Sequence, residues 1–210
     1  MRPLAGGGRA RHLMGMATGP NRAAPGAASL AGQLLIAMPD MGDPRFARSV
    51  VCLCAHSPQG AMGLVLNRPV ERLSFDALLR QVGVEPVPPQ RQIRLLAGGP
   101  VEEGRGFVLH SDDWRAEGSI AVQGGLALTA SVDILKDIAA GGGPRHCVLA
   151  LGYAGWGPGQ LEAEIAENAW LIAPPDEALL FDGELATKWR RALSKLKVDP
   201  SRIVGGAGRA

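Results

Sequence analysis

The chain of 210 residues is long enough for one domain with a sizeable core and short for two. Its composition, 46% hydrophobic and 20% charged, is that of a globular protein and excludes a disordered or fibrous one. Three cysteines are too few for a secreted disulfide framework, and no apolar run reaches the roughly 18 residues that a membrane span needs. We therefore expect a cytoplasmic protein of a reducing compartment, without membrane association.

The formal net charge of +2 conceals a strong segregation of charge along the chain. Residues 1–39 carry four arginines and no acid, and residues 188–210 carry seven basic residues against one acid. The segment 40–187 between them has a net charge of −8. Because a nucleic-acid-binding domain usually presents a basic face, we do not expect direct binding of nucleic acid.

The first part of the chain divides into a tail and the beginning of a β-rich domain. Residues 1–31, rich in Arg, Gly, Ala and Pro, are expected to be a disordered extension because they bury too little apolar surface. Apolar, β-forming runs predict strands over 33–39 and 49–56. The sequence SPQG then predicts a tight turn, with a returning hairpin strand over 61–67.

The middle of the chain mixes helices and strands. A helix is predicted over 74–83, capped by Ser74 and ended by Gly83, and a Pro-rich connector follows it. Three short apolar runs predict further strands, over 93–99, 106–111 and 119–123. Residues 127–143 predict a strand that passes into a helix capped by Ser131.

The last part of the chain contains the best candidate for a buried strand, over 146–153, followed by a glycine-rich loop. A helix is predicted to begin near Gln160, and a strand over 170–174. An apolar stripe at helical spacing predicts a basic C-terminal helix, formed by Leu185, Trp189, Leu193 and Leu196. Because there is no regular βαβ alternation and at least one hairpin, the pattern predicts a single α+β domain, over 32–210, with a mixed sheet.

The glycine-rich segment LGYAGWGPGQLEAEIAENAW (151–170) has two interpretations. Glycines before a helix N-terminus can hold a phosphate. However, no Lys or Arg lies between Arg145 and Lys188, a span that contains seven acids. Glu162 and Glu164 already satisfy the helix dipole. The sequence therefore favours a tight structural turn, in which Tyr153 and Trp156 cover the edge of the core.

The sequence contains only weak indications of a metal or cofactor site. Cys52 and Cys54 fall on one face of a strand, and with Cys147 and a histidine they could form a zinc site. Structural zinc sites usually show paired C-x₂-C spacings, whereas this chain has C-x-C alone. We therefore expect buried free thiols, no metal and no cofactor.

His110 ends a predicted strand close to the carboxylates of Glu102, Glu103 and Asp112. A histidine beside carboxylates can act as a general base, which would suit a hydrolase-like enzyme. No nucleophile in a recognisable context accompanies it, so the sequence favours a histidine on a solvated acidic loop. Asn67 and Arg68 also have two interpretations, because they could bind a ligand carboxylate or end a strand before Pro69.

Several segments occur in one order along the chain: LLIAMPDMGDPRFARSVV (34–51), GAMGLVLNRPV (60–70), GGPV (98–101), FVLH (107–110), LTASVD (128–133), LGYAGWGPGQLEAEIAENAWL (151–171) and AGRA (207–210). Together they resemble the bacterial YqgE/AlgH proteins, and the resemblance covers residues 32–210. It implies a small cytosolic protein with an α+β fold and a mixed, partly barrel-like sheet. It implies no established activity or cofactor, and only a link to transcriptional regulation.

We therefore expect a non-enzymatic regulatory or interaction protein that binds another protein or a small molecule in one cleft. The motif loops are expected to rim this cleft because such loops gather at one sheet edge. Its expected residues are Asn67, Arg68, Gly98, Gly99, Pro100, His110, Tyr153, Trp156, Gln160 and Glu162. A single cleft requires these segments to lie within about 15 Å of one another, since more distant groups cannot share a small ligand. The hydrolase based on His110 is the alternative, and DNA contact through the C-terminal helix ranks last.

Overall fold

Nine strands form one strongly curled sheet in the computed structural model, which describes residues 28–199. The strands are β1 (Leu34–Ala37), β2 (Val50–Ser57), β3 (Gly60–Val65), β4 (Leu95–Ala97), β5 (Val101–Ser111), β6 (Ile120–Val122), β7 (Leu126–Thr129), β8 (Cys147–Trp156) and β9 (Trp170–Ala173). The helices within this range are α2 (Phe75–Val82), α3 (Val132–Ala139), α4 (Gln160–Ala166), α5 (Glu177–Phe181) and α6 (Leu185–Lys195).

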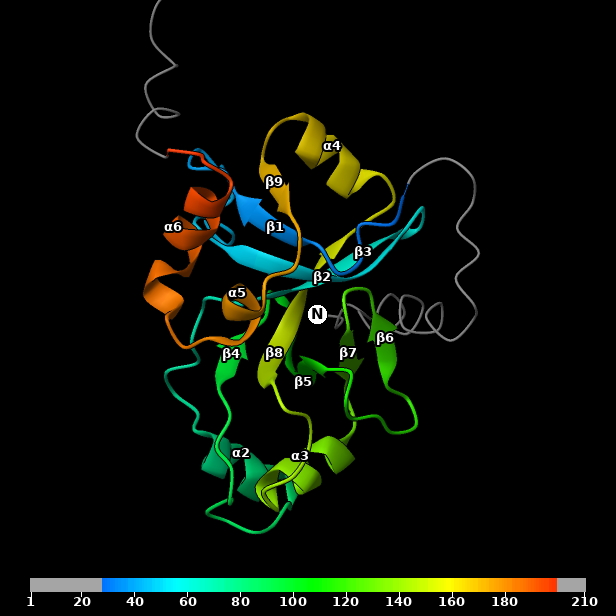
Figure 1. The fold of residues 1–210 in the computed structure, drawn as a ribbon, viewed down its shortest axis with the longest axis vertical. Coiled ribbons are helices and arrows are strands. Elements are labelled where there is room, and N and C mark those ends of the chain that lie inside the picture. Colours follow the sequence, from blue (N-terminus) through cyan, green and yellow to red (C-terminus); the bar gives the residue numbers. More distant parts are fainter. Residues whose placement is uncertain (1–27, 200–210) are drawn as a thin grey trace, which may run out of the picture.

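The strand order is β6-β7-β5-β8-β3-β2-β1-β9, with β4 beside β8. The pair β4–β8 is parallel, whereas the other strand pairs of the described region are antiparallel. Helices α2 and α3 cover one end of the molecule, and α4 lies at the opposite end (Figure 1). The predicted α+β fold with a mixed, partly barrel-like sheet is therefore confirmed.

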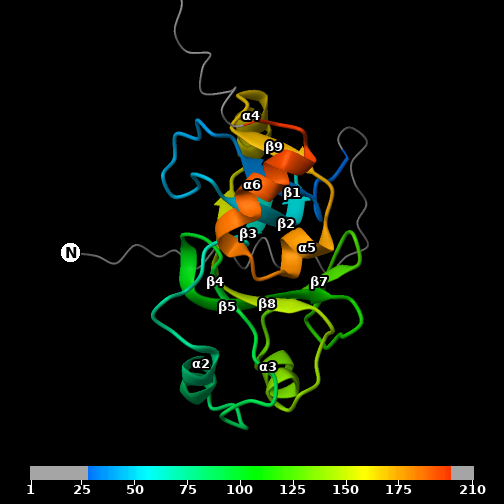
Figure 2. The same ribbon diagram turned by 60° about the vertical axis from the view of Figure 1, so that its left-hand side comes forward.

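Three apolar clusters hold the curled sheet together. The largest lies inside the curl, where inward-facing residues of β1, β2, β5 and β8 meet α5 and α6. A second covers the outer face of β1–β3 under α4, and a third lies between the β4–β8 strands and helices α2 and α3. Figure 2 shows these layers, with α5 and α6 on one side of β4, β5 and β8 and with α2 and α3 on the other.

Strand β8 pairs with β4 and β5 along its first part and with β3 at its end. Between these two parts, the alternation of side chains between the inner and outer faces of the sheet is interrupted. Val148 and Ala150 face the inner core, and so does Tyr153, although strict alternation would turn residue 153 outward. The change occurs at Gly152, which has φ = 71°. The register of the β5–β8 pair also shifts here, and because side chains alternate along a strand, such an irregularity changes the face of every later side chain. It therefore places Trp156 on the outer face, in the cluster under α4.

Most predicted elements are present, with three local differences. Ser74 caps α2 through its side chain, and Gly83 ends this helix in the left-handed region. Ser131 stands at the N-cap of α3 but makes no capping hydrogen bond. Residues 154–156, predicted as the start of a loop, form the end of β8 because they pair with β3. Helix α5 lies in a segment for which we predicted no helix.

The ends of the domain are described only in part. The predicted disordered extension lies outside the described residues except for 28–31, and the motif at 207–210 lies outside them as well. Within 28–31, Leu30 donates its backbone N–H to His56 Nδ1 at 3.0 Å. Among residues 28–199, no helix is both long and apolar enough to cross a membrane.

A buried lysine fastens α6 to the end of α5. Lys188 is fully buried, and its Nζ donates to the carbonyl of Leu179 at 2.7 Å and to that of Asp182 at 3.3 Å. The Asp182 carboxylate lies 3.2 Å from the same Nζ and also forms a bidentate pair with Arg191. Hydrogen bonds from Arg191, and also from Lys188, lower the pKa of Asp182 to about 2.

Candidate functional site

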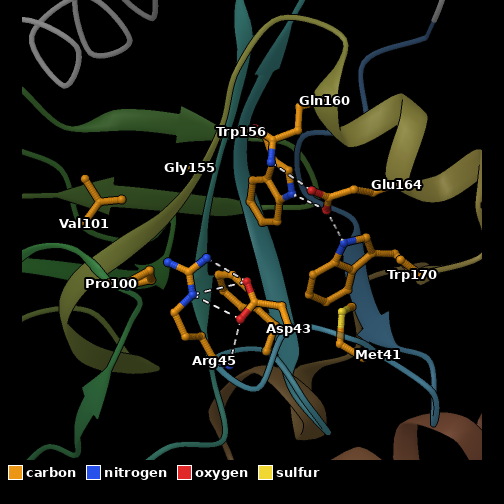
Figure 3. A pocket seen from close by; sticks show the side chains of 12 residues that line it. Met41, Asp43, Arg45, Pro100, Val101, Gly155, Trp156, Gln160, Glu164 and Trp170 are labelled. Atoms are coloured by element: carbon orange, nitrogen blue, oxygen red, sulfur yellow. Dashed lines mark hydrogen bonds and ion pairs between the residues drawn. The ribbon is translucent and has the colours of Figure 1, made fainter.

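A pocket of about 310 Å³ opens on the outer face of the sheet, beneath α4 (Figure 3). The loop between β1 and β2 (38–49, hereafter the Phe46 loop) forms one wall, and α4 with the start of β9 forms another. The beginning of β5 and the end of β8 complete it. The lining residues are Met41, Asp43, Arg45, Phe46, Pro100, Val101, Gly155, Trp156, Gln160, Glu164, Ala169 and Trp170.

Three aromatic rings, from the Phe46 loop, β8 and β9, contact one another in the lining of the pocket. The rings of Phe46 and Trp156 are stacked with centroids 6.3 Å apart, and Phe46 meets Trp170 edge to face at 5.8 Å. The two indole rings are also arranged edge to face, 6.0 Å apart. Because such pairs add about 0.5–1.5 kcal/mol beyond burial, they fix the position of Phe46 and of the loop that carries it.

The carboxylate of Glu164 joins the two tryptophans to α4. Its Oε2 accepts the indole N–H of Trp156 at 2.9 Å and that of Trp170 at 2.8 Å. Its Oε1 accepts Nε2–H of Gln160 at 2.8 Å, and Gln160 Oε1 in turn accepts the backbone N–H of Gly157 at 3.0 Å. The helix and the end of β8 are thus held in one hydrogen-bonded unit.

Asp43 and Arg45 neutralise each other at the rim. The guanidinium of Arg45 donates to both carboxylate oxygens of Asp43, at 3.1 and 2.7 Å. This hydrogen bonding holds the pKa of Asp43 below its usual range. The same guanidinium lies 5.9 Å from the ring centroid of Phe46. The pair contributes no net charge to the pocket.

Three of the predicted site residues, Pro100, Trp156 and Gln160, line this pocket. Gly98 and Gly99 lie behind it, where their backbone packs against β8 so closely that a Cβ on Gly99 would stand 2.1 Å from the carbonyl carbon of Tyr153. Tyr153 itself is buried in the inner core, edge to face with Phe107. Gly98 and Gly99 therefore serve to let their own backbone approach that of β8 closely.

Asn67 and Arg68 support the Phe46 loop and do not line the pocket. Asn67 accepts the backbone N–H of Val50 at 3.0 Å and donates to the carbonyl of Arg48 at 2.8 Å. Arg68 donates to the carbonyl of Ala47 at 3.2 Å. These bonds hold the end of the loop, where Arg48 adopts φ = 56°. The amide and guanidinium therefore position the wall of the pocket.

The structure does not bring His110 to the pocket. His110 pairs with Cys147 at the first residue of β8, whereas Trp156 is the last, a separation of roughly 30 Å along the strand. The residue is fully buried, and its ring nitrogens lie 2.9 Å from Thr129 Oγ1 and 2.8 Å from the Ser111 carbonyl. Burial lowers the pKa of His110. One cleft does not hold all the predicted residues.

Glu162 lies outside the pocket as well. Its Oε1 is 2.7 Å from Nε2 of His56, whose other ring nitrogen accepts the backbone N–H of Leu30. Hydrogen bonds from its own backbone N–H, and also from His56, hold the pKa of Glu162 below its usual range. This contact ties α4 to β2 and to the segment that precedes β1.

The thiols form no metal centre within the described residues. Cys52 and Cys54 are both buried in the inner core, and a hydrogen bond with Cys52, together with burial, raises the pKa of Cys54 well above its usual value. Cys147 lies 3.6 Å from Arg91, and burial raises the pKa of its thiol. Among residues 28–199, no three His, Cys, Asp or Glu side chains gather as a metal site requires.

The sequence alone did not predict that the Phe46 loop, Glu164 or Trp170 would belong to the site. Phe46, Glu164 and Trp170 carry the geometry of the pocket, yet none of them was predicted as a site residue. One signal was available, because Trp156, Glu164 and Trp170 occur within a single motif segment. Phe46 lies 110 residues from Trp156, so its contact with that ring depends on the sheet topology.

The chain matches the family model described as DUF179, AlgH-like, over residues 34–201. The UPF0301 protein of Rhodospirillum rubrum is 48% identical over 181 residues, which cover 86% of this chain and 94% of the relative. That of Beijerinckia indica is 53% identical over 193 residues, with 87% and 93% covered. No activity accompanies these names.

Two solved structures have similar folds. The solution structure of the AlgH protein from Pseudomonas aeruginosa aligns with a TM-score of 0.71 and 43% identity, covering 91% of this chain and all of that one. A crystal structure of a Corynebacterium diphtheriae protein aligns with a TM-score of 0.63 at 22% identity, over 83% of this chain and 91% of that one, and shows the fold alone. The chain belongs to the AlgH-like family of UPF0301 proteins.

Proposed function

We propose that this protein is a non-enzymatic interaction protein, which binds a segment of a partner protein or a small molecule in the pocket under α4. The wall of the pocket carries this proposal, because it combines three aromatic rings with polar groups that are already bonded to one another. Its volume of about 310 Å³ is at the lower end of the range for ligand sites, roughly 300–1,000 Å³, and suits one inserted side chain or a small ligand.

The chemistry of the lining supports binding over catalysis. None of the described residues that line the pocket is a histidine, cysteine, serine, threonine or lysine. Of its two carboxylates, Asp43 is paired with Arg45, and Glu164 accepts three hydrogen bonds. The hydrolase-like alternative has less support, because His110 is buried with both ring nitrogens bonded.

A regulatory role in the cytoplasm is part of the same proposal. The protein would act on transcription through a partner or ligand, without touching DNA. The net charge of −8 over residues 40–187 supports this part, because an acidic body repels the phosphate backbone.

Filling the pocket tests the proposal. In Ala169→Leu, three extra carbon atoms enter the cavity, whereas Ala163→Leu adds the same atoms on the exposed face of α4. Each full-length protein is immobilised and exposed to a lysate of Rhodospirillum rubrum, and the retained proteins and small molecules are identified by mass spectrometry. We expect a ligand that the wild type and Ala163→Leu retain and Ala169→Leu loses. Equal retention by all three proteins would contradict binding in this pocket.

A further inference from the structure

Glu164 is the one carboxylate of the pocket that has no cationic partner among residues 28–199. All three groups that it binds are neutral donors, namely two indole N–H groups and a side-chain amide. The other charges of the lining, on Asp43 and Arg45, cancel in a bidentate pair. The pocket therefore carries one negative charge that no cation of the described chain neutralises.

The carboxylate has capacity for a further hydrogen bond. A carboxylate offers about four lone-pair sites, two on each oxygen. Oε2 of Glu164 accepts two bonds, whereas Oε1 accepts one, from Gln160. The side chain is half-buried on the wall of the cavity (Figure 3). A donor that enters the pocket can thus reach an acceptor that is already fixed in position.

The aromatic rings add to the same preference. Trp156 and Trp170 direct their N–H edges at Glu164, and the stacked ring of Phe46 covers one face of Trp156. The part of these rings that lines the pocket presents the electron-rich surface of an aromatic ring. Such faces attract cations. The guanidinium of Arg45 beside the ring of Phe46 shows that a cation is accommodated here.

The remaining walls suit an aliphatic stem. Met41, Pro100, Val101 and Ala169 contribute apolar surface to the pocket. A long side chain such as lysine buries its methylene stem against apolar surface while its charged end makes polar contacts. An anionic ligand would instead meet the charge of Glu164, with Arg45 already engaged by Asp43.

We infer that the pocket binds a primary ammonium group on an aliphatic stem, with the ammonium at Glu164 and the aromatic rings and the stem along the apolar walls. This inference rests on the proposed function and specifies its ligand. Two sources share this chemistry: a lysine side chain of a partner protein and a free aliphatic amine.

Matched probes test the charge of the ligand. Pentylammonium chloride and its neutral isostere 1-pentanol are titrated into the full chain, and the indole N–H resonances of the tryptophans are followed by NMR. We expect the ammonium to shift the resonances of Trp156 and Trp170 and to bind at least about tenfold more tightly than the alcohol, because a charge-assisted contact is roughly twice as strong as a neutral one. Added salt should weaken its binding.

Matched variants test the residue. Glu164→Gln removes the charge but keeps an acceptor oxygen for the indoles, whereas Glu167→Gln makes the same change at an exposed position that ends α4. We expect Glu164→Gln to weaken pentylammonium binding at least about tenfold and Glu167→Gln to leave it within about twofold, since an exposed charge outside the pocket is screened.

The source of the ammonium is decided by two further probes. Tighter binding of the blocked peptide acetyl-Gly-Lys-Gly-amide than of 1,5-diaminopentane supports a partner protein, and the reverse order supports a free amine. Preference for 1-pentanol, or ammonium binding unchanged in Glu164→Gln, would overturn the inference and leave the pocket as a site for neutral ligands. A lack of response to every probe would also overturn it, while the lysate capture with Ala169→Leu decides the proposed function separately.

Discussion

Replacing Glu164 by alanine tests the hydrogen-bonded unit that builds the pocket. In Glu164→Ala, the indole N–H groups of Trp156 and Trp170, residues that are only 4% and 3% exposed, lose their acceptor. An unsatisfied buried donor costs about 1–3 kcal/mol, so two such donors cost about 2–6 kcal/mol. Water that enters the pocket can hydrate them in part. We therefore expect the free energy of unfolding to fall by about 2–4 kcal/mol.

Urea and thermal denaturation, followed by tryptophan fluorescence, measure this loss. For a domain of this size, 1 kcal/mol corresponds to about 2–4 °C, so the Tm should fall by about 4–16 °C. The exposed control Glu167→Ala should stay within about 0.5 kcal/mol of the wild type. Glu164→Gln, which keeps an acceptor oxygen, should lose less than half of what Glu164→Ala loses. If Glu164→Ala and Glu167→Ala unfold at the same urea concentration, the bonds to the indoles do not stabilise the fold and the reasoning is refuted.

Three further variants test other parts of the structure. Lys188→Met leaves the carbonyls of Leu179 and Asp182 without their donor and should lower the free energy of unfolding by about 1–3 kcal/mol in urea denaturation, against less than about 1 kcal/mol for the exposed Lys195→Met. Equal losses would contradict the role of Lys188 in holding α6 to α5. Because burial lowers the pKa of His110, the unfolded chain binds more protons below about pH 6.5, so the free energy of unfolding should decrease as the pH falls from 7.5 to 5.5, and more weakly in His110→Asn. Gly99→Ala should cost more than about 3 kcal/mol or prevent folding, since its Cβ would collide with the backbone of β8, whereas Gly42→Ala meets open space and should fold normally.

Local signals predicted the elements of the fold well. Ser74 and Gly83 bound helix α2 as predicted, because capping depends on residues within one turn of the helix end. The hairpin of β2 and β3 follows from two apolar runs around a turn sequence. Ser131 shows the limit of such signals, since its hydroxyl is buried without a hydrogen-bond partner in the structure.

Long-range contacts explain what the sequence did not predict. Glycines 152 and 155 indicate a turn when they are read locally, but they lie in a strand because β3 and β5 supply pairing partners on both sides. Gly152 adopts its positive φ where the register of the β5–β8 pair shifts. Gly99 approaches this position so closely that its carbonyl oxygen would stand 2.4 Å from a Cβ on Gly152. The residues of the segment 151–170 alone could not predict this contact, because Gly99 lies about fifty residues earlier in the chain.

The motif segments of the family converge on the pocket from different directions. The segment 34–51 supplies the Phe46 loop, and the segment 60–70 fixes that loop through Asn67 and Arg68. The segments 98–101 and 151–171 form the backbone crossing that turns Trp156 outward, and the latter also supplies Glu164 and Trp170. Four separate stretches of the sequence thus contribute to one aromatic wall around one carboxylate. This convergence favours the pocket, more than the buried His110, as the functional site that we propose for this chain.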